Sequence, residues 1–148
     1  MASILLVDDD EQLRPMLKMV LERAGHVVNA AGNGKEALVS YSLHPTELVV
    51  TDLVMPDKEG LETIRELRRT YPDLKIIAMS GGGRTGVQNY LELAVKFGAN
   101  HILNKPFSNQ ELLDGVQMLV SARNVELSAD DARRASFIKP ENRFTNSY

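Results

Sequence analysis

The 148-residue chain lacks cysteine and tryptophan, and only 5% of its residues are aromatic. Without cysteine it has no disulfide framework, no thiolate metal site and no cysteine nucleophile. Its core must therefore be mainly aliphatic. No apolar run approaches the roughly 20 residues of a transmembrane helix, and the N-terminus lacks the basic start and long apolar stretch of a signal peptide. We therefore expect a soluble, cytoplasmic protein without a membrane partner.

The chain also lacks an excess of positive charge. Its 17 lysines and arginines face 20 aspartates and glutamates, which gives a net charge of −3. This balance argues against a general nucleic-acid-binding protein, because such proteins usually carry a basic surface. The length and the 43% hydrophobic content indicate one globular domain.

Five short apolar runs, rich in β-branched residues, alternate with segments of helical spacing. The runs are typical of strands buried on both faces of a parallel sheet, and they lie at residues 4–7, 27–28, 48–50, 74–79 and 102–103. Apolar residues recur every three or four positions within 13–24, 37–41, 61–67, 87–95 and 112–120, which predicts five helices. The expected helix stops are Gly25 and Gly98, and the expected N-caps are Asn33 and either Ser108 or Asn109.

This alternation predicts an α/β domain, a doubly wound five-stranded parallel sheet in the order 2-1-3-4-5 with helices on both faces. A closed eight-stranded barrel would need about twice the length. Ligands of open α/β sheets bind at the carboxyl ends of the strands, at the switch point between the first and third strands. Residues 1–122 complete the domain. Residues 123–148 are expected to form a C-terminal tail, either a short helix or disordered, without a recognisable effector domain.

Chemically active side chains follow four of the expected strands. The first strand runs into Asp8 and Asp9, the third ends at Asp52, and Ser80 and Lys105 follow the fourth and fifth. Because the first and third strands are neighbours, the three carboxylates converge, and a hard cation such as Mg²⁺ would relieve their repulsion. A carboxylate in such surroundings can accept a phosphoryl group. Taken alone, the acidic run at 8–11 would also suit the N-terminus of the following helix.

These motifs resemble those of a bacterial two-component response-regulator receiver domain, of the single-domain type. The resemblance covers residues 3 to about 122 and rests on Ile4 to Asp9, Thr51-Asp52, Met55-Pro56, Met79-Ser80-Gly81, Gly98-Ala99 and Lys105-Pro106-Phe107. It implies the flavodoxin-like receiver fold, with Asp52 as the phosphoacceptor beside a bound Mg²⁺ ion. Asp9 would bind this ion directly and Asp8 through water. The main-chain carbonyl of Val54 would complete the protein ligands.

The same resemblance assigns the remaining residues and the function. Lys105 would bind the phosphoryl group, Ser80 would be the switch hydroxyl, and the Lys105–Pro106 peptide bond would be cis. The implied function is phosphorelay signal transduction, in which a histidine kinase or phosphotransfer protein phosphorylates the chain and so changes its binding to a downstream protein. Such a chain is a switch that gains and loses its own phosphoryl group, and not a metabolic enzyme. The fourth and fifth helices form a common receiver interface, so the resemblance leaves both a homodimer and another partner open.

One position departs from the receiver pattern. Receivers often carry tyrosine or phenylalanine three residues before the lysine, where this chain has Ile102. The coupling of Ser80 to an aromatic side chain is therefore in doubt. We expect the signal to travel mainly through residues 81–86, because the glycines at 81–83 make this loop easy to rearrange.

Two other functions compete with this interpretation. A phosphatase of the haloacid-dehalogenase type would use Asp8 as its nucleophile. The Asp8-x-Asp10 motif fits its opening pattern, and Ser80, Lys105 and Asp130-Asp131 follow in the expected order. That interpretation leaves Asp52 unexplained. The second alternative is a truncated DNA-binding response regulator, but residues 123–148 contain no helix-turn-helix pattern. We therefore expect this chain to bind no nucleic acid.

Overall fold

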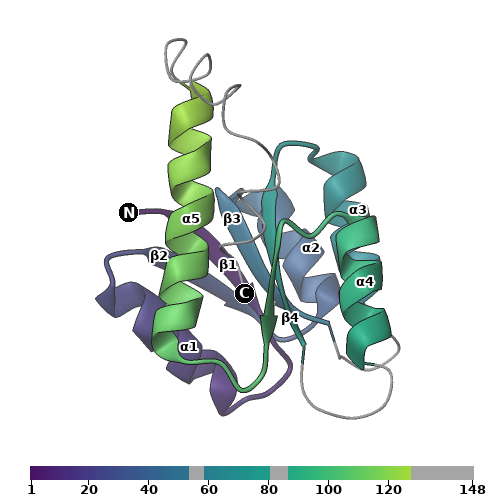
Figure 1. Cartoon of the computed structure of the whole chain (residues 1–148), viewed down its shortest axis with the longest axis horizontal. Coiled ribbons are helices and arrows are strands. Elements are labelled where there is room, and N and C mark those ends of the chain that lie inside the picture. Colours follow the sequence, from purple (N-terminus) through teal and green to yellow (C-terminus); the bar gives the residue numbers. More distant parts are fainter. Residues whose placement is uncertain (54–58, 81–86, 128–148) are drawn as a thin grey trace.

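The computed structural model of the chain describes residues 1–53, 59–80 and 87–127. Strands and helices alternate along these residues, as the apolar spacing predicted (Figure 1). The strands are β1 (Ser3–Val7), β2 (Val27–Ala31), β3 (Leu48–Asp52), β4 (Lys75–Ser80) and β5 (His101–Asn104). The helices are α1 (Leu13–Arg23), α2 (Gly34–Leu43), α3 (Glu59–Thr70), α4 (Val87–Phe97) and α5 (Asn109–Leu127).

The strands form one parallel sheet in the order β2-β1-β3-β4-β5, which confirms the predicted topology. β1 and β3 are neighbours near the centre of the sheet. At the carboxyl end of β3, Asp52 lies opposite Met79 of β4, and the next residue of β4, Ser80, lies opposite Asn104 of β5. Because all the strands run in one direction, the residues that follow them meet at one edge of the sheet.

Helices cover both faces of this sheet (Figure 1). Side chains of α1 and α5 form one buried core with the sheet, and side chains of α2, α3 and α4 form the other. Within β1, Leu5 and Val7 belong to the α2–α4 side, whereas Ile4 and Leu6 belong to the α1–α5 side. All four side chains are fully buried. The unbroken apolar run of β1 therefore reflects two cores, and burial stabilises the fold by about 1.5–3 kcal/mol for each such side chain.

The edge strand β2 is less buried than the sequence predicted. Val27 of β2 is 55% exposed, so the prediction that this apolar run is buried on both faces is wrong at its first residue. The reason is the position of β2, which pairs only with β1 and so lies at the edge of the sheet. Val28, the next residue, is buried as expected.

The predicted helix boundaries are confirmed where the chain offered clear capping residues. Asn33 Oδ1 accepts a hydrogen bond of 2.9 Å from the backbone N–H of Glu36 at the start of α2. Ser108 Oγ accepts one of 3.0 Å from Glu111, so Ser108 is the cap of α5. Gly25 and Gly98 follow α1 and α4 with φ angles of +96° and +121°, a region that favours glycine.

The last helix extends beyond the predicted domain boundary. α5 continues to Leu127, so the first residues assigned to the tail are helical, and residues 128–148 lie outside the described part of the chain. None of the helices in the described ranges combines the length and the apolar character needed to cross a membrane.

Candidate functional site

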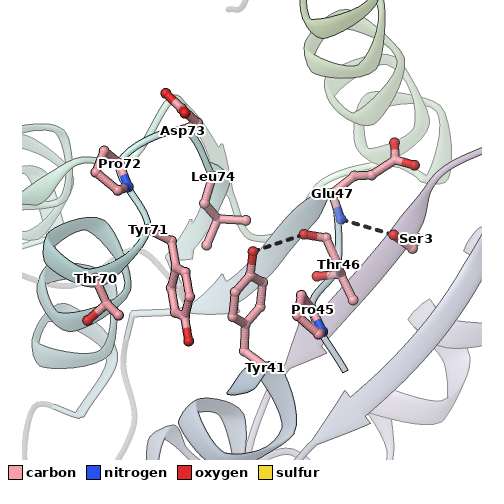
Figure 2. Close-up of a pocket in the computed structure, with 10 residues that line it drawn as sticks. All are labelled: Ser3, Tyr41, Pro45, Thr46, Glu47, Thr70, Tyr71, Pro72, Asp73 and Leu74. Carbon is pink, nitrogen blue, oxygen red and sulfur yellow. Dashed lines mark hydrogen bonds between the residues drawn. The ribbon is translucent and has the colours of Figure 1, made fainter. Parts of the chain in front are cut away.

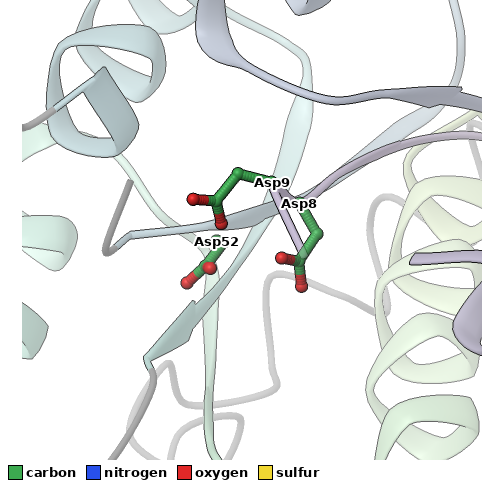
Figure 3. Close-up of side chains that lie close together, drawn as sticks. All are labelled: Asp8, Asp9 and Asp52. Carbon is green, nitrogen blue, oxygen red and sulfur yellow. The ribbon is translucent and has the colours of Figure 1, made fainter. Parts of the chain in front are cut away.

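Three predicted metal-binding aspartates, Asp8, Asp9 and Asp52, meet at the carboxyl edge of the sheet (Figure 3). One carboxylate oxygen from each lies within 4.8 Å of the others. Asp8 directly follows β1 and Asp52 ends β3, so the pairing of these two strands brings their carboxylates together. Both are buried, at 0% and 4% exposure, whereas Asp9 is exposed. Among the residues that the structure describes, this is the only group of three or more such side chains close enough to share an ion.

Lys105 supplies positive charge to this cluster. Its Nζ lies 3.1 Å from Asp8 Oδ2 and 3.4 Å from Asp52 Oδ2. Burial acts to lower the pKa of Lys105, but the charges of Asp52 and Asp8 and hydrogen bonds to both outweigh it, so the pKa is raised. The backbone N–H of Lys105 donates to the carbonyl of Ser80 at 2.8 Å, and the following Lys105–Pro106 bond is cis, as expected. The ammonium group is thus held, charged, between two buried carboxylates.

The aspartates of the acidic run after β1 differ in what they contact. Asp8 Oδ1 accepts a hydrogen bond from the backbone N–H of Asp10 at 2.9 Å. Asp10 Oδ1 in turn accepts from the backbone N–H groups of Leu13 and Gln12, and these two bonds lower the pKa of Asp10. Asp10 is exposed and stabilises the first turn of α1, while Asp8 and Asp9 belong to the acidic cluster. The helix-start interpretation therefore holds for Asp10, whereas Asp8 and Asp9 lie in the carboxylate cluster that the metal-site interpretation needs.

This division counts against the phosphatase alternative. That interpretation pairs Asp10 with the nucleophile Asp8, yet the Asp10 carboxylate is taken up by the backbone of α1 and lies outside the cluster. Asp52, which the alternative does not use, is the residue that shares the cluster with Asp8 and Lys105. The later acidic pair, Asp130-Asp131, lies outside the described residues.

Ser80 ends β4 next to the residue that faces Asp52 across the sheet. The residue is 1% exposed, and its Oγ has no hydrogen-bond partner within the described part of the chain. A buried hydroxyl left in this way costs about 1–3 kcal/mol of stability. This hydroxyl is therefore available to donate to a group that binds at this edge of the sheet.

The cluster fits a magnesium ion in its chemistry. All its donor atoms are carboxylate oxygens, which hard divalent cations prefer. Two of the three carboxylates are buried, and Lys105 is the one cation that the structure pairs with them among the described residues. Val54, whose carbonyl would complete the predicted ligand set, lies outside the described residues, as does the loop at 81–86. Ile102, at the position where receivers often carry an aromatic residue, is buried in β5.

Two residues near the cluster escaped the sequence analysis. Arg14 of α1 donates a hydrogen bond from Nη1 to the main-chain carbonyl of Asp8 at 2.8 Å. Gly60 of α3 packs so closely on the end of β3 that a Cβ atom there would clash with the carbonyl oxygens of Asp52 and Leu53. A glycine directly before the predicted helix at 61–67 was the available signal for Gly60. Arg14 resembles an ordinary solvated arginine in sequence.

The opposite edge of the sheet contains a pocket of about 470 Å³ (Figure 2). Two of its lining hydroxyls bond to the main chain just before β3. Tyr41 Oη donates to the carbonyl of Thr46 at 3.1 Å, and Ser3 Oγ accepts from the backbone N–H of Glu47 at 2.9 Å. The rings of Tyr41 and Tyr71 lie 4.4 Å apart between their centroids. These contacts join neighbouring segments of the chain and so stabilise the fold. The acidic cluster makes the carboxyl edge the candidate functional site.

Comparisons with known proteins show which family the chain resembles. The chain is 38% identical over 124 residues to the DNA-binding transcriptional regulator NtrC of Azospirillum brasilense, a match that covers 82% of this chain and 24% of NtrC. It is 32% identical over 120 residues to the chemotaxis protein CheY of Halobacterium salinarum, which covers 81% of this chain and 98% of CheY. The chain thus spans about a quarter of NtrC and nearly all of this CheY.

The fold comparison points the same way. A response regulator receiver domain protein from Methanospirillum hungatei superposes with a TM-score of 0.77 at 26% identity, over 84% of this chain and 97% of that one. Residues 4–117 match the response regulator receiver domain family. With this match over most of the sequence, the chain belongs to the receiver domains of two-component response regulators.

Proposed function

We propose that the chain is a phosphorylation-driven switch in which Asp52 accepts a phosphoryl group from a histidine kinase or a phosphotransfer protein. One observation carries the proposal. Asp52 ends β3 with its carboxylate beside those of Asp8 and Asp9 and 3.4 Å from Lys105 Nζ. Family membership supports phosphorelay signalling as the setting. A cytoplasmic location belongs to the same proposal.

The proposed chemistry is an in-line transfer between two nucleophiles. A carboxylate oxygen of Asp52 attacks phosphorus, the N–P bond of the phosphohistidine breaks, and the released imidazole nitrogen takes up a proton. The product is an acyl phosphate on Asp52. Its hydrolysis by water returns the free carboxylate and inorganic phosphate, which resets the switch.

Magnesium is part of this proposal. Asp9 and Asp52 would hold the ion directly and Asp8 through water, together with the carbonyl of Val54. When bound, Mg²⁺ supplies positive charge that offsets the negative charge of the phosphoryl oxygens. The burial of Asp8 and its bond to Lys105 keep its carboxylate fixed at the edge of this site.

Lys105 and Ser80 would act on the phosphoryl group itself. Lys105 is already charged and lies between Asp8 and Asp52, so it can move its ammonium group to a phosphoryl oxygen with little displacement. Ser80 Oγ is buried and has no hydrogen-bond partner in the described ranges, so it can donate to a phosphoryl oxygen after transfer. This new bond would favour one of two conformations and change the binding of a downstream protein or of a second copy of the chain.

The test is to locate the phosphoryl group. The chain is incubated with acetyl phosphate and Mg²⁺, and the intact mass and the modified peptide are determined for four proteins. Wild type and Asp73→Asn, which changes an exposed aspartate at the opposite edge, should both gain one phosphoryl group. Asp52→Asn should gain none at this site. Asp8→Asn should be modified at Asp52 at a lower rate.

Two results would contradict the proposal. An acyl phosphate on Asp8 that persists in Asp52→Asn would support the phosphatase interpretation instead. A wild-type chain that accepts no phosphoryl group from acetyl phosphate or from a phosphorylated histidine kinase, although its circular dichroism shows a folded protein, would mean that the site does not act as a phosphoacceptor.

A further inference from the structure

Arg14 connects α1 to the main chain of the acidic cluster. Its Nη1 donates a 2.8 Å hydrogen bond to the carbonyl of Asp8. This carbonyl lies just beyond Val7, the last residue of β1, where the regular pairing of the sheet has ended. Backbone groups at such a position need a partner outside the strand ladder. The guanidinium group therefore fixes the direction of the Asp8 carbonyl, and with it the peptide plane that leads into Asp9.

Asp9 depends on this backbone for its orientation. In the parts of the chain that the structure describes, its carboxylate makes no hydrogen bond or ion pair. The residue is instead held from both sides. Arg14 holds the carbonyl that precedes it, and Asp8 Oδ1 accepts a 2.9 Å hydrogen bond from the N–H of Asp10 that follows it. These two bonds aim the Asp9 side chain at the cluster.

Gly32, in the loop between β2 and α2, lies close to the guanidinium group of Arg14. A Cβ atom at Gly32 would lie 3.2 Å from Arg14 Nη1 and 3.4 Å from Glu36 Oε2. The N–H of Gly32 already donates to Glu36 Oε2 at 2.8 Å, which fixes the loop. A side chain at this position would press on Arg14, because the loop cannot easily move away.

We propose that Arg14 is a positioning residue for the metal site: its bond to the Asp8 carbonyl aims Asp9 at the ion, and the absence of a side chain at Gly32 leaves room for that bond. This inference rests on the proposed function, since it assumes that the cluster binds Mg²⁺. Arg14 would contact neither the ion nor the phosphoryl group.

The sign of one measurement separates positioning from simple electrostatics. Arg14 is a positive charge close to a site for a cation, so its removal would by charge alone strengthen Mg²⁺ binding. If Arg14 positions Asp9, its removal weakens binding, and the loss of such an outer-shell contact typically costs about tenfold or more in metal affinity. Arg14→Lys keeps the charge but has no planar fork to hold the carbonyl, so we expect its affinity to lie between those of wild type and Arg14→Ala.

The experiment measures Mg²⁺ dissociation constants of the full chain by isothermal titration calorimetry. Arg14→Ala should raise the constant about tenfold. Arg23→Ala, which removes an exposed arginine from the last turn of the same helix, should leave it unchanged. In the metal-free protein, hydrogen exchange at the Asp10 amide should be faster in Arg14→Ala. At low Mg²⁺ concentration, Arg14→Ala should be phosphorylated more slowly than wild type. At saturating Mg²⁺, its rate should return most of the way to the wild-type rate.

Gly32→Ala tests the same contact without touching Arg14. It should weaken Mg²⁺ binding in the wild-type background and have no further effect in Arg14→Ala. The inference would be overturned if Gly32→Ala weakened Mg²⁺ binding equally in both backgrounds, or if Arg14→Ala bound Mg²⁺ as tightly as wild type or more tightly. In either case, Mg²⁺ binding by the wild-type chain would still support the proposed function. A wild-type chain that binds no Mg²⁺ would instead remove the proposed function on which the inference rests.

Discussion

The two edges of the sheet use their polar residues in opposite ways. At the amino edge, Tyr41 and Ser3 bond to the main chain of neighbouring loops and close the fold. At the carboxyl edge, Asp8, Asp9 and Asp52 crowd together, and Ser80 is buried without a hydrogen-bond partner in the described ranges. At the amino edge the hydroxyls of Tyr41 and Ser3 thus bond to the main chain, whereas the carboxyl edge leaves the Ser80 hydroxyl for a ligand.

This contrast follows from the parallel topology. The strands place unlike residues at their two ends, so stability and function can be assigned to opposite edges with little interference. The crowding of like charges at the carboxyl edge costs stability in the metal-free protein, which Lys105 offsets only for the two aspartates that it contacts. Substitutions at either edge can test whether the two edges act separately.

The largest effect is expected at the amino edge. Tyr41→Ala removes a ring that is 6% exposed and packs against Tyr71, and the loss of a buried aromatic side chain costs about 3–5 kcal/mol. Urea unfolding should show this loss. Under conditions where the variant remains folded, its Mg²⁺ affinity should equal that of wild type.

Tyr41→Phe is the matched control, because it keeps the ring and removes the hydroxyl that donates to the Thr46 carbonyl, at a cost of about 1 kcal/mol. Weaker Mg²⁺ binding in the folded Tyr41→Ala variant would contradict the separation of the two edges. It would mean that packing at the amino edge also shapes the acidic cluster.

The second effect concerns the charge of Asp9. Mg²⁺ at about 100 times its dissociation constant should stabilise the wild-type chain by about 2.7 kcal/mol. Asp9→Asn should lose most of this gain. Without Mg²⁺ the same variant should be more stable than wild type, by less than about 1 kcal/mol, because it removes an exposed charge that repels Asp8 and Asp52.

Thermal unfolding with and without Mg²⁺ measures both changes. Glu47→Gln, which removes a carboxylate that lines the pocket at the amino edge, should gain as much from Mg²⁺ as wild type does. An Asp9→Asn variant that is less stable than wild type in the absence of metal would show that the Asp9 charge is favourable in the free protein, contrary to the repulsion argued above.

The sequence allowed the main features of the carboxyl edge to be predicted because they follow from strand order. Once β1 and β3 are neighbours, Asp8 and Asp52 must converge, and the register of β4 and β5 brings Ser80 and Lys105 to the same edge. Periodicity and strand length contain this information. No side-chain conformation has to be known.

Contacts that depend on side-chain conformation could not be predicted in this way. The bond from Arg14 to the Asp8 carbonyl requires one rotamer of a long side chain and an open space at Gly32, and neither leaves a periodic signal. The exposure of Val27 goes with its place on an edge strand, which an apolar run does not reveal. Both features are set by packing between distant segments.

The smallest effect concerns pH and His101, which begins β5 and packs against Gly115 of α5. The side chain is 5% exposed, and burial lowers the pKa of His101. Below a pH of about 6.5 the unfolded chain therefore takes up a proton that the folded chain resists, and stability falls by at most about 1.4 kcal/mol per pH unit. Lys105 does not contribute to this fall, because its raised pKa means that its stabilising charge is lost only in strongly alkaline solution.

His101→Leu should therefore show a shallower loss of unfolding free energy between about pH 7 and pH 5 than wild type does. His44→Gln, which replaces an exposed histidine after α2, should keep the wild-type slope. The phosphoacceptor chemistry should be indifferent to the His101 substitution at neutral pH, since this residue begins β5 whereas Lys105 follows its end. A wild-type slope in His101→Leu would mean that another group sets the acid sensitivity, such as His26 before β2, whose pKa burial also lowers.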